Sequence, residues 1–274
     1  MKHSTFNFKW LALAFQISLL SSALILDYLN LSAVEVIGMI FGVILLDRLL
    51  KAISGSHSLK WNLKQLSLRD LPLSSISLAS SVIFNLRADL PFLIAASVLA
   101  VISKYVLLFR GRHFLNPSNF GIVVALLVWP SEAVTQGSRW GTTWIFPLII
   151  LGFGIPVLYL AKKLTMLVAI FIAYPLGALL LESIAGFPAL ANWPTMYSTG
   201  FLLAFFFMMT DPATSPQRRW TQALYAVSIV FFDQLFRALE RPDSLMYAIF
   251  LTTTLIPISR LLEERMRSQK SAQS

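Results

Sequence analysis

The sequence predicts an all-α membrane protein of about ten transmembrane helices, arranged as two inverted repeats of five helices. Two observations lead to this fold class. Apolar residues make up 57% of the 274 residues and charged residues only 13%, and the mean hydropathy is +0.71, far from the balance of a soluble domain. The Lys and Arg residues between the apolar runs are distributed asymmetrically. We therefore expect residues 1–274 to form a single polytopic membrane domain.

The apolar residues fall into ten runs. A helix needs about 20 mainly apolar residues to cross a bilayer, and charge clusters, prolines and Asn, Asp or Gly residues separate such segments. The predicted spans cover residues 10–27, 33–50, 71–87, 90–109, 117–134, 142–161, 164–183, 196–210, 219–237 and 243–261. No convincing small-residue cleavage site follows the first run, which is therefore interpreted as an uncleaved helix.

The cationic residues test the number of spans, because Lys and Arg in short loops favour the cytoplasmic side. With both termini inside, 18 of the 22 Lys and Arg residues are cytoplasmic, and those outside are Arg87, Arg139, Arg237 and Arg241. A wrong number of spans would destroy this asymmetry. We thus expect an even number of spans in a multi-pass membrane protein with both termini cytoplasmic. The net charge of +9 then belongs to a basic rim facing anionic lipid headgroups, and nucleic acid is not an expected partner.

Ten spans divide into two halves, residues 1–134 and 142–261, followed by a cytoplasmic tail over 262–274. An odd number of spans in each half makes equivalent helices point in opposite directions across the membrane. The best trace of the repeat is an apolar helix that runs into Asp and Pro, at Asp89 and Pro91 in the first half and at Asp211 and Pro212 in the second.

Composition excludes several kinds of chemistry. The chain has no cysteine, which excludes disulfides, thiolate-bound iron–sulfur clusters and cysteine nucleophiles within it. The three histidines are scattered, so no metal site is expected. The longest predicted polar segment, Ala52–Asp70, is basic and amphipathic, which fits a helix on the lipid surface or a docking site for a partner. Asp233 and Arg237 have the spacing of a helical ion pair, either structural or part of a proton or cation relay. Glu35, Asp47 and Glu182 lie near span ends, where contact with solvent accounts for their charge.

Two motifs predict polar helix starts within this apolar chain. They are Gly111–Pro117 and Met209–Pro216, in which Asn116 and Asp211 are good N-cap residues and the prolines after them suit a first helical turn. Both lie on the predicted cytoplasmic side, where free N–H groups and helix dipoles favour an anionic or carbonyl-rich ligand. The alternative is that both are ordinary helix starts and that the neighbouring arginines contact lipid phosphates.

The same motifs carry a resemblance to a known family. GRHFLNPSNFG at residues 111–121 and FLLAFFFMMTDPATSP at residues 201–216 resemble helix starts of the NqrB/RnfD family, the large membrane subunits of sodium-translocating NADH:quinone reductase and of the Rnf complex. Lys104 lies where that family often has a lysine. The likeness covers about residues 71–267. It implies ten helices in two inverted halves, flavins held within the membrane, and electron transfer coupled to ion movement.

One departure from the family changes the expected cofactor. Family members carry a Ser-Gly-Ala-Thr segment in the external loop after the fifth span, and its threonine bears covalent FMN. The loop here, residues 131–143, lacks that segment, and Thr142 and Thr143 are better interpreted as caps of the sixth helix. In this respect the chain resembles abbreviated RnfD-like proteins, including the UnbU type encoded with enediyne biosynthesis genes. The resemblance therefore implies a noncovalent flavin, riboflavin or FMN, or a quinone.

A flavin needs a flat apolar slot and polar groups that tune its ring. Phe114, Phe120 and the run 205–207 are expected to provide the slot. The expected cofactor contacts are Lys104, Arg112, His113, Asn116, Pro117, Thr210, Asp211, Pro212 and Thr214. No catalytic residue is assigned, and whether the chain is part of an enzyme stays open. The alternatives to electron transport are a non-redox transporter or channel on the same scaffold, and a membrane anchor for redox-complex or biosynthetic partner subunits.

Overall fold

The computed structural model describes residues 2–54, 73–135, 140, 144–186, 193–211, 214–258 and 260–261. Within these ranges the chain is almost entirely helical, which confirms the all-α part of the predicted fold class. Most of the predicted interfacial segment, from residue 55 onward, and the predicted tail over 262–274 lie outside the described residues.

The first half consists of five helices and short strands at their ends. The helices are α1 (Lys2–Ile25), α2 (Ala33–Ser54), α3 (Leu73–Asn85), α4 (Leu90–Val106) and α5 (Pro117–Val128). The strands are β1 (Leu86–Arg87), β2 (Leu108–Phe109), β3 (Arg112–His113) and β4 (Val134–Thr135). β1 pairs antiparallel with β4, Leu86 opposite Thr135, and β2 pairs antiparallel with β3, Leu108 opposite His113.

The second half has the same succession of long helices, with one of them built in two parts. Its elements are α6 (Ile145–Ala161), α7 (Leu164–Ala185), the 3-10 helix η3 (Trp193–Tyr197), α9 (Thr199–Ala204), the π-helix η4 (Phe205–Met209), α10 (Arg219–Ala238) and α11 (Ser244–Thr254). α9 continues directly into η4, and together they occupy the eighth predicted span.

Several helices are shorter than the predicted spans, whereas α1, α2, α7 and α10 are longer. Among the described residues, α7 alone is long and apolar enough to cross a membrane by itself, and seven other apolar helical segments span only 10–17 residues. For example, α5 ends at Val128, where the sequence predicted a helix to Val134. Trp129 leaves the helical conformation with φ −126° and ψ 59°, and Pro130 follows it, which disfavours a helical residue before it. The number of membrane spans therefore stays a prediction.

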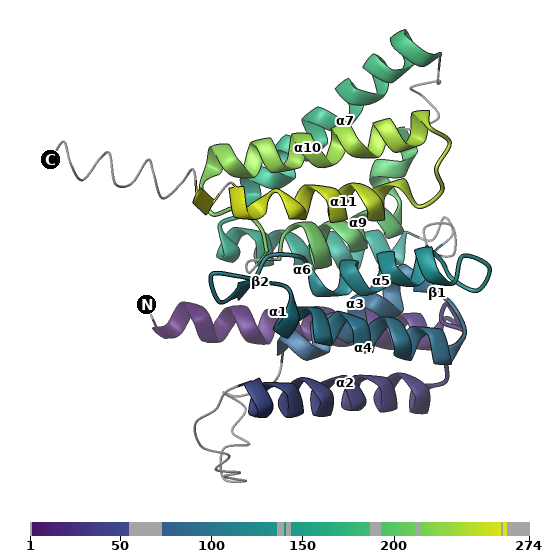
Figure 1. The fold of residues 1–274 in the computed structure, drawn as a ribbon, viewed down its shortest axis with the longest axis vertical. Helices are drawn as coiled ribbons and strands as arrows, with labels where there is room; N and C mark the ends of the chain where they lie inside the picture. The colour runs from purple at the N-terminus through teal and green to yellow at the C-terminus, as the bar shows by residue number, and fades with distance from the viewer. Residues whose placement is uncertain are drawn as a thin grey trace, which may run out of the picture.

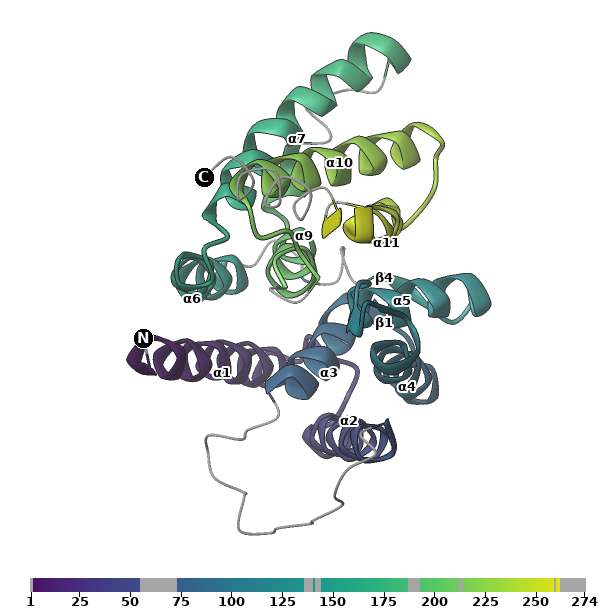
Figure 2. The same cartoon turned by 60° about the vertical axis from the view of Figure 1, so that its left-hand side comes forward.

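The two halves pack against each other through helices that have the same position in the order of each half. α1 packs on α6, α3 on α9 and α5 on α11. Within the first half α4 packs on α2 and α5, and within the second α10 packs on α7 and α11. In Figure 2 the helices of the first half lie below and those of the second half above, with these three pairs along the boundary. Figure 1 shows α2 and α7 at opposite ends of the bundle.

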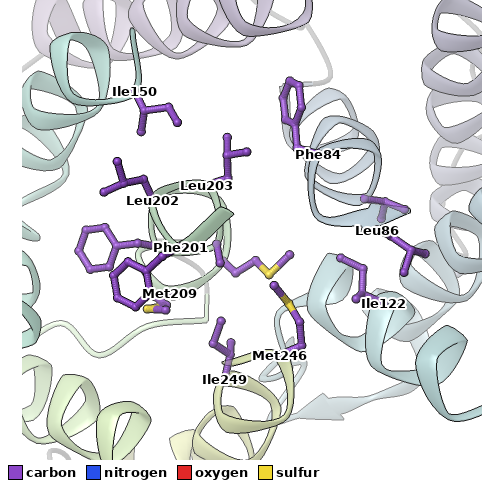
Figure 3. Packing of buried hydrophobic residues seen from close by; sticks show 14 of the residues in the cluster. Phe84, Leu86, Ile122, Ile150, Phe201, Leu202, Leu203, Met209, Met246 and Ile249 are labelled. Carbon is purple, nitrogen blue, oxygen red and sulfur yellow. The ribbon is translucent and has the colours of Figure 1, made fainter. Parts of the chain in front are cut away.

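Apolar side chains fill the boundary between the halves. Phe84 from α3 and Ile122 from α5 belong to the same buried cluster as Leu203 from α9 and Met246 from α11 (Figure 3). One polar contact crosses the boundary beside them: the Asn119 side chain donates to the Met246 carbonyl at 3.0 Å. The cluster therefore fixes how α3 and α5 meet the second half.

The outer helices expose large apolar side chains instead of burying them. Val34 and Ile37 on α2 are 79% and 67% exposed, and Ile172 and Ile184 on α7 are 57% and 76% exposed. Soluble monomers rarely present so much contiguous apolar surface. This exposure is what a surface facing lipid requires.

Candidate functional site

A cavity of about 310 Å³ lies where the two motifs meet. Its walls come from α1, α3, α4 and α6, from β3 and the start of α5, and from η4 and the two residues after it. Its volume is at the lower end of the range for small-molecule sites, about 300–1,000 Å³. We call it the motif cavity, because residues of both motifs line it.

The structure brings together most of the residues that the sequence singled out. Those that line the motif cavity are Lys104, His113, Asn116, Pro117, Thr210 and Asp211. Thr214 stands behind them, its hydroxyl donating to the Asp211 carboxylate at 2.9 Å. Arg112 is exposed on β3 and is not among the lining residues. Pro212 lies outside the described residues, as do Thr142 and Thr143 in the loop before α6.

Asn116 has the geometry that its sequence context predicted. Its φ of −67° and ψ of 120° are extended, and its Oδ1 accepts from the backbone N–H of Asn119 at 3.0 Å, so it is the N-cap of α5. Its Nδ2 donates to the Met208 carbonyl at 3.3 Å and to Asp211 Oδ2 at 3.5 Å. One amide thus caps a helix of the first half and bonds to the end of η4 in the second.

Asp211 does not begin a helix, contrary to the sequence interpretation. Among the described residues the next helix, α10, starts only at Arg219. The Asp211 carbonyl instead accepts from the backbone N–H groups of Thr214 and Ser215, at 3.2 and 3.0 Å, and from the Ser215 hydroxyl at 2.6 Å. Pro216, just after this turn, disfavours helical geometry at the residue before it. The turn uses the N–H groups of Thr214 and Ser215 within the chain, and the carboxylate of Asp211 remains at the cavity.

A tight hairpin positions His113 at the cavity. Arg110 and Gly111 link β2 to β3 with φ values of 52° and 74°, and two successive positive φ angles define the two-residue turn that glycine favours. Burial lowers the pKa of His113, and Lys104 and Arg260 lower it further, while the negative charge of Asp211 opposes them. His113 is therefore a neutral imidazole near pH 7, able to donate from one ring nitrogen and accept at the other.

The π-helix η4 supplies aromatic walls. The Thr210 N–H donates to the Phe205 carbonyl at 3.2 Å, five residues back, and the Thr210 hydroxyl donates to the Phe206 carbonyl at 3.1 Å. Phe206 and Phe207 line the cavity, and the Phe207 ring stacks on Phe15 with centroids 5.5 Å apart. Single π-helical turns are often found at functional sites. The predicted Phe114 and Phe120 do not line the cavity; Phe120 faces Phe250.

A glycine in α6 leaves room for one of these rings. A Cβ atom on Gly154 would lie 2.4 Å from Cε1 of Phe206, closer than any real contact. Gly152, two residues earlier, has nothing within 4 Å of the same position. The ring of Phe206 therefore depends on Gly154 for its place at the cavity.

Sequence reasoning missed the partner of Lys104. The Lys104 ammonium pairs with Asp47 Oδ1 at 2.7 Å, and Asp47 also accepts from the Ser75 hydroxyl at 2.6 Å and the Tyr105 hydroxyl at 2.9 Å. Asp47 is only 8% exposed, so its interpretation as a solvated residue near a span end is wrong. The network ties α2, α3 and α4 together and holds a cation at the cavity wall. Its only sequence signal is an acid three residues before the end of the second predicted span.

A second polar cluster lies at the other end of α3. A cavity of about 410 Å³ there is lined by Asn85 at the end of α3 and by Arg237, Asp243 and Ser244 of the second half. Asp233, which is fully buried, pairs with Arg237 at 2.9 Å as predicted and accepts from Ser244 at 2.6 Å. No group of residues suited to a metal ion occurs in the described ranges.

Comparison with known families agrees with the second motif. The model of the NQR2, RnfD, RnfE family matches residues 137–266, from before α6 to beyond α11. No curated protein matches the chain. The family match supports an NqrB/RnfD-like assignment, the one that the two motifs indicated. Such membership implies a membrane protein of Rnf- and Nqr-type electron-transport complexes, which agrees with the exposed apolar faces of α2 and α7.

Proposed function

We propose, from the premise of an NqrB/RnfD-like membrane protein, that this chain binds a noncovalent flavin in the motif cavity and serves as an electron-transport subunit. The observation that carries the proposal is the meeting of two motifs far apart in sequence. Asn116 and Asp211, 95 residues apart, are in hydrogen-bonding contact at the wall of one cavity. A structural role alone does not require both to border an open space.

The groups around the cavity fit the two surfaces of a flavin. Phe206 and Phe207 give it an aromatic wall, as a flat ring system needs. Lys104 and His113 offer donors to ring carbonyls and nitrogens, and the Thr210 hydroxyl, which donates to the Phe206 carbonyl, offers an acceptor. A bound flavin would supply one- and two-electron transfer, and the residues of this chain would orient its ring and set the charge around it.

The arrangement of helices also supports the topology that the charges predicted. A two-fold relation between halves brings the helices nearest the axis against their equivalents and leaves others far apart. The pairs α1 with α6, α3 with α9 and α5 with α11, and the separation of α2 from α7, follow that pattern. We propose two inverted halves of five helices, in the bacterial inner membrane with both termini cytoplasmic. The motif cavity then opens toward the cytoplasm and the second cavity toward the outside.

Flavin content of the purified protein tests the proposal. The full chain, purified in mild detergent, is expected to show flavin absorbance, and chromatography after denaturation is expected to release free riboflavin or FMN. Asn116→Leu and Asp211→Ala are expected to lower flavin occupancy, because each removes a polar group from the wall. Asp89→Asn is the matched control, since Asp89 occupies the equivalent place in the first half, is exposed and makes no capping bond.

Three outcomes count against a flavin protein. Absence of any flavin, together with redox-independent solute flux in proteoliposomes, supports a transporter or channel. Absence of flavin with a stably copurifying partner supports a membrane anchor. A quinone recovered in place of flavin assigns the cavity to a quinone, which the same donors also suit.

A further inference from the structure

Gln16 is a polar side chain buried in the apolar helix α1. It is 3% exposed and lines the motif cavity, although the sequence around it, from Trp10 to Leu26, is otherwise almost entirely apolar. Polar groups at membrane depth are costly and generally have a partner or a function. Only one end of the Gln16 amide has a hydrogen-bond partner among the described residues.

The amide nitrogen of Gln16 has a hydrogen-bond partner, and its oxygen has none among the described residues. Nε2 of Gln16 donates to the hydroxyl of Ser77 on α3, which also lines the cavity. Among the described residues, Oε1 of Gln16 has no hydrogen-bond partner. A buried acceptor left unpaired costs about 1–3 kcal/mol. Gln16 therefore brings to the cavity wall a side chain, held by Ser77, whose buried acceptor oxygen is unpaired and would be satisfied by a ligand donor.

The unpaired acceptor favours a ligand that carries a hydrogen-bond donor as well as carbonyl oxygens. Lys104 and His113 bring donors to the same cavity, and these donors suit carbonyl oxygens. A quinone presents only carbonyl oxygens along its polar edges, so it would leave Gln16 Oε1 unpaired. A flavin presents an imide, an N–H donor between two carbonyl acceptors.

We propose that Gln16 Oε1 accepts a hydrogen bond from the imide N–H of the bound ligand, and that Gln16 thereby selects a flavin over an oxidised quinone. The inference rests on the proposed function, because it concerns the same cavity. Gln16 is a binding and specificity residue in this scheme, and Ser77 positions it.

The test compares two ligands on the intact protein. The full chain, stripped of endogenous flavin in detergent, is titrated with riboflavin and with 3-methylriboflavin, whose imide nitrogen carries no hydrogen, and quenching of flavin fluorescence reports binding. We expect riboflavin to bind about tenfold more tightly to the native chain, since one hydrogen bond is lost and one buried acceptor stays unpaired. This arm needs no variant, so it does not depend on how a mutant folds.

The second arm changes the protein. Gln16→Leu keeps a similar volume and removes the acceptor, and it is expected to weaken riboflavin binding about three- to tenfold. The difference between the two flavins should then shrink to about threefold or less. Ser21→Ala is the matched control, because Ser21 is exposed on the same helix and bonds only within it; it should bind both flavins as the native chain does.

The outcomes separate this inference from the proposed function. Equal binding of both flavins to the native chain overturns the role of Gln16 and leaves a flavin protein standing. An unchanged flavin preference in Gln16→Leu also overturns it. Binding of neither flavin overturns the proposed function and this inference together.

Discussion

Removing the carboxylate of Asp47 should destabilise the protein through Lys104. In the native chain Asp47 binds the Lys104 ammonium at 2.7 Å and accepts hydrogen bonds from Ser75 and Tyr105. Asp47→Ala removes all of these and leaves the ammonium of Lys104 beside an apolar cavity. The perturbation therefore combines lost hydrogen bonds with an unpaired charge.

The expected loss of stability depends on how far the Asp47–Lys104 ion pair is shielded from solvent. The side chains of Lys104 and Asp47 are 14% and 12% exposed. Breaking a buried pair from one side costs about 3–5 kcal/mol, whereas an exposed pair is worth about 0–1 kcal/mol. This pair is closer to the buried limit but keeps some exposure, so we expect about 3 kcal/mol. At about 2 °C per kcal/mol for a chain of this size, the melting temperature should fall by about 6 °C.

Thermal unfolding of the detergent-solubilised chain, followed by tryptophan fluorescence, measures this effect. A double-mutant cycle with Lys104→Met separates the unpaired charge from the lost packing. The double variant should be about 1–3 kcal/mol more stable than the sum of the single effects, because it no longer holds a lone ammonium. Glu182→Ala is the matched control: Glu182 is exposed near a span end, and its removal should stay within about 0.5 kcal/mol.

Additive effects in this cycle, to within about 0.5 kcal/mol, would refute the coupling between Asp47 and Lys104. Equal melting temperatures for Asp47→Ala and Glu182→Ala would refute the buried character of the network.

Other regions give further predictions. Burial lowers the pKa of His113 below its ordinary 6.5, so the unfolded chain takes up the proton first as the pH falls. The folded protein should therefore lose stability progressively as the pH falls below about 6.5. His113→Asn should flatten the melting-temperature profile between pH 5 and 7. Gly154→Ala should reduce flavin occupancy by moving an aromatic wall of the cavity, while Gly152→Ala should leave it unchanged. Asp233→Ala should lower the melting temperature more than Asp47→Ala does, because Asp233 is fully buried with Arg237 beside it.

Local sequence patterns predicted the features that depend on near neighbours in the chain. Apolar runs located the helices, and the Asn116–Pro117 pair located the N-terminus of α5 because an N-cap acts within three residues. The spacing of Asp233 and Arg237 predicted their ion pair, since residues four apart meet on one helix face. The same reasoning failed at Asp211, where a turn closed by its own carbonyl replaces a helix start.

The contacts that shape the motif cavity are long-range, and one sequence does not contain them. Asp47 and Lys104 are 57 residues apart, and Gln16 and Ser77 are 61 apart. Glu35 and Asp47 both lie near span ends, yet Glu35 is partly exposed and closes a local capping box with Ser32, while Asp47 is buried against other helices. What distinguishes them is whether α3 and α4 cover the side chain. The cavity therefore depends on how α1 through α4 pack around the two motifs, and exchanging Gln16 or Asp47 should change ligand binding without altering either motif.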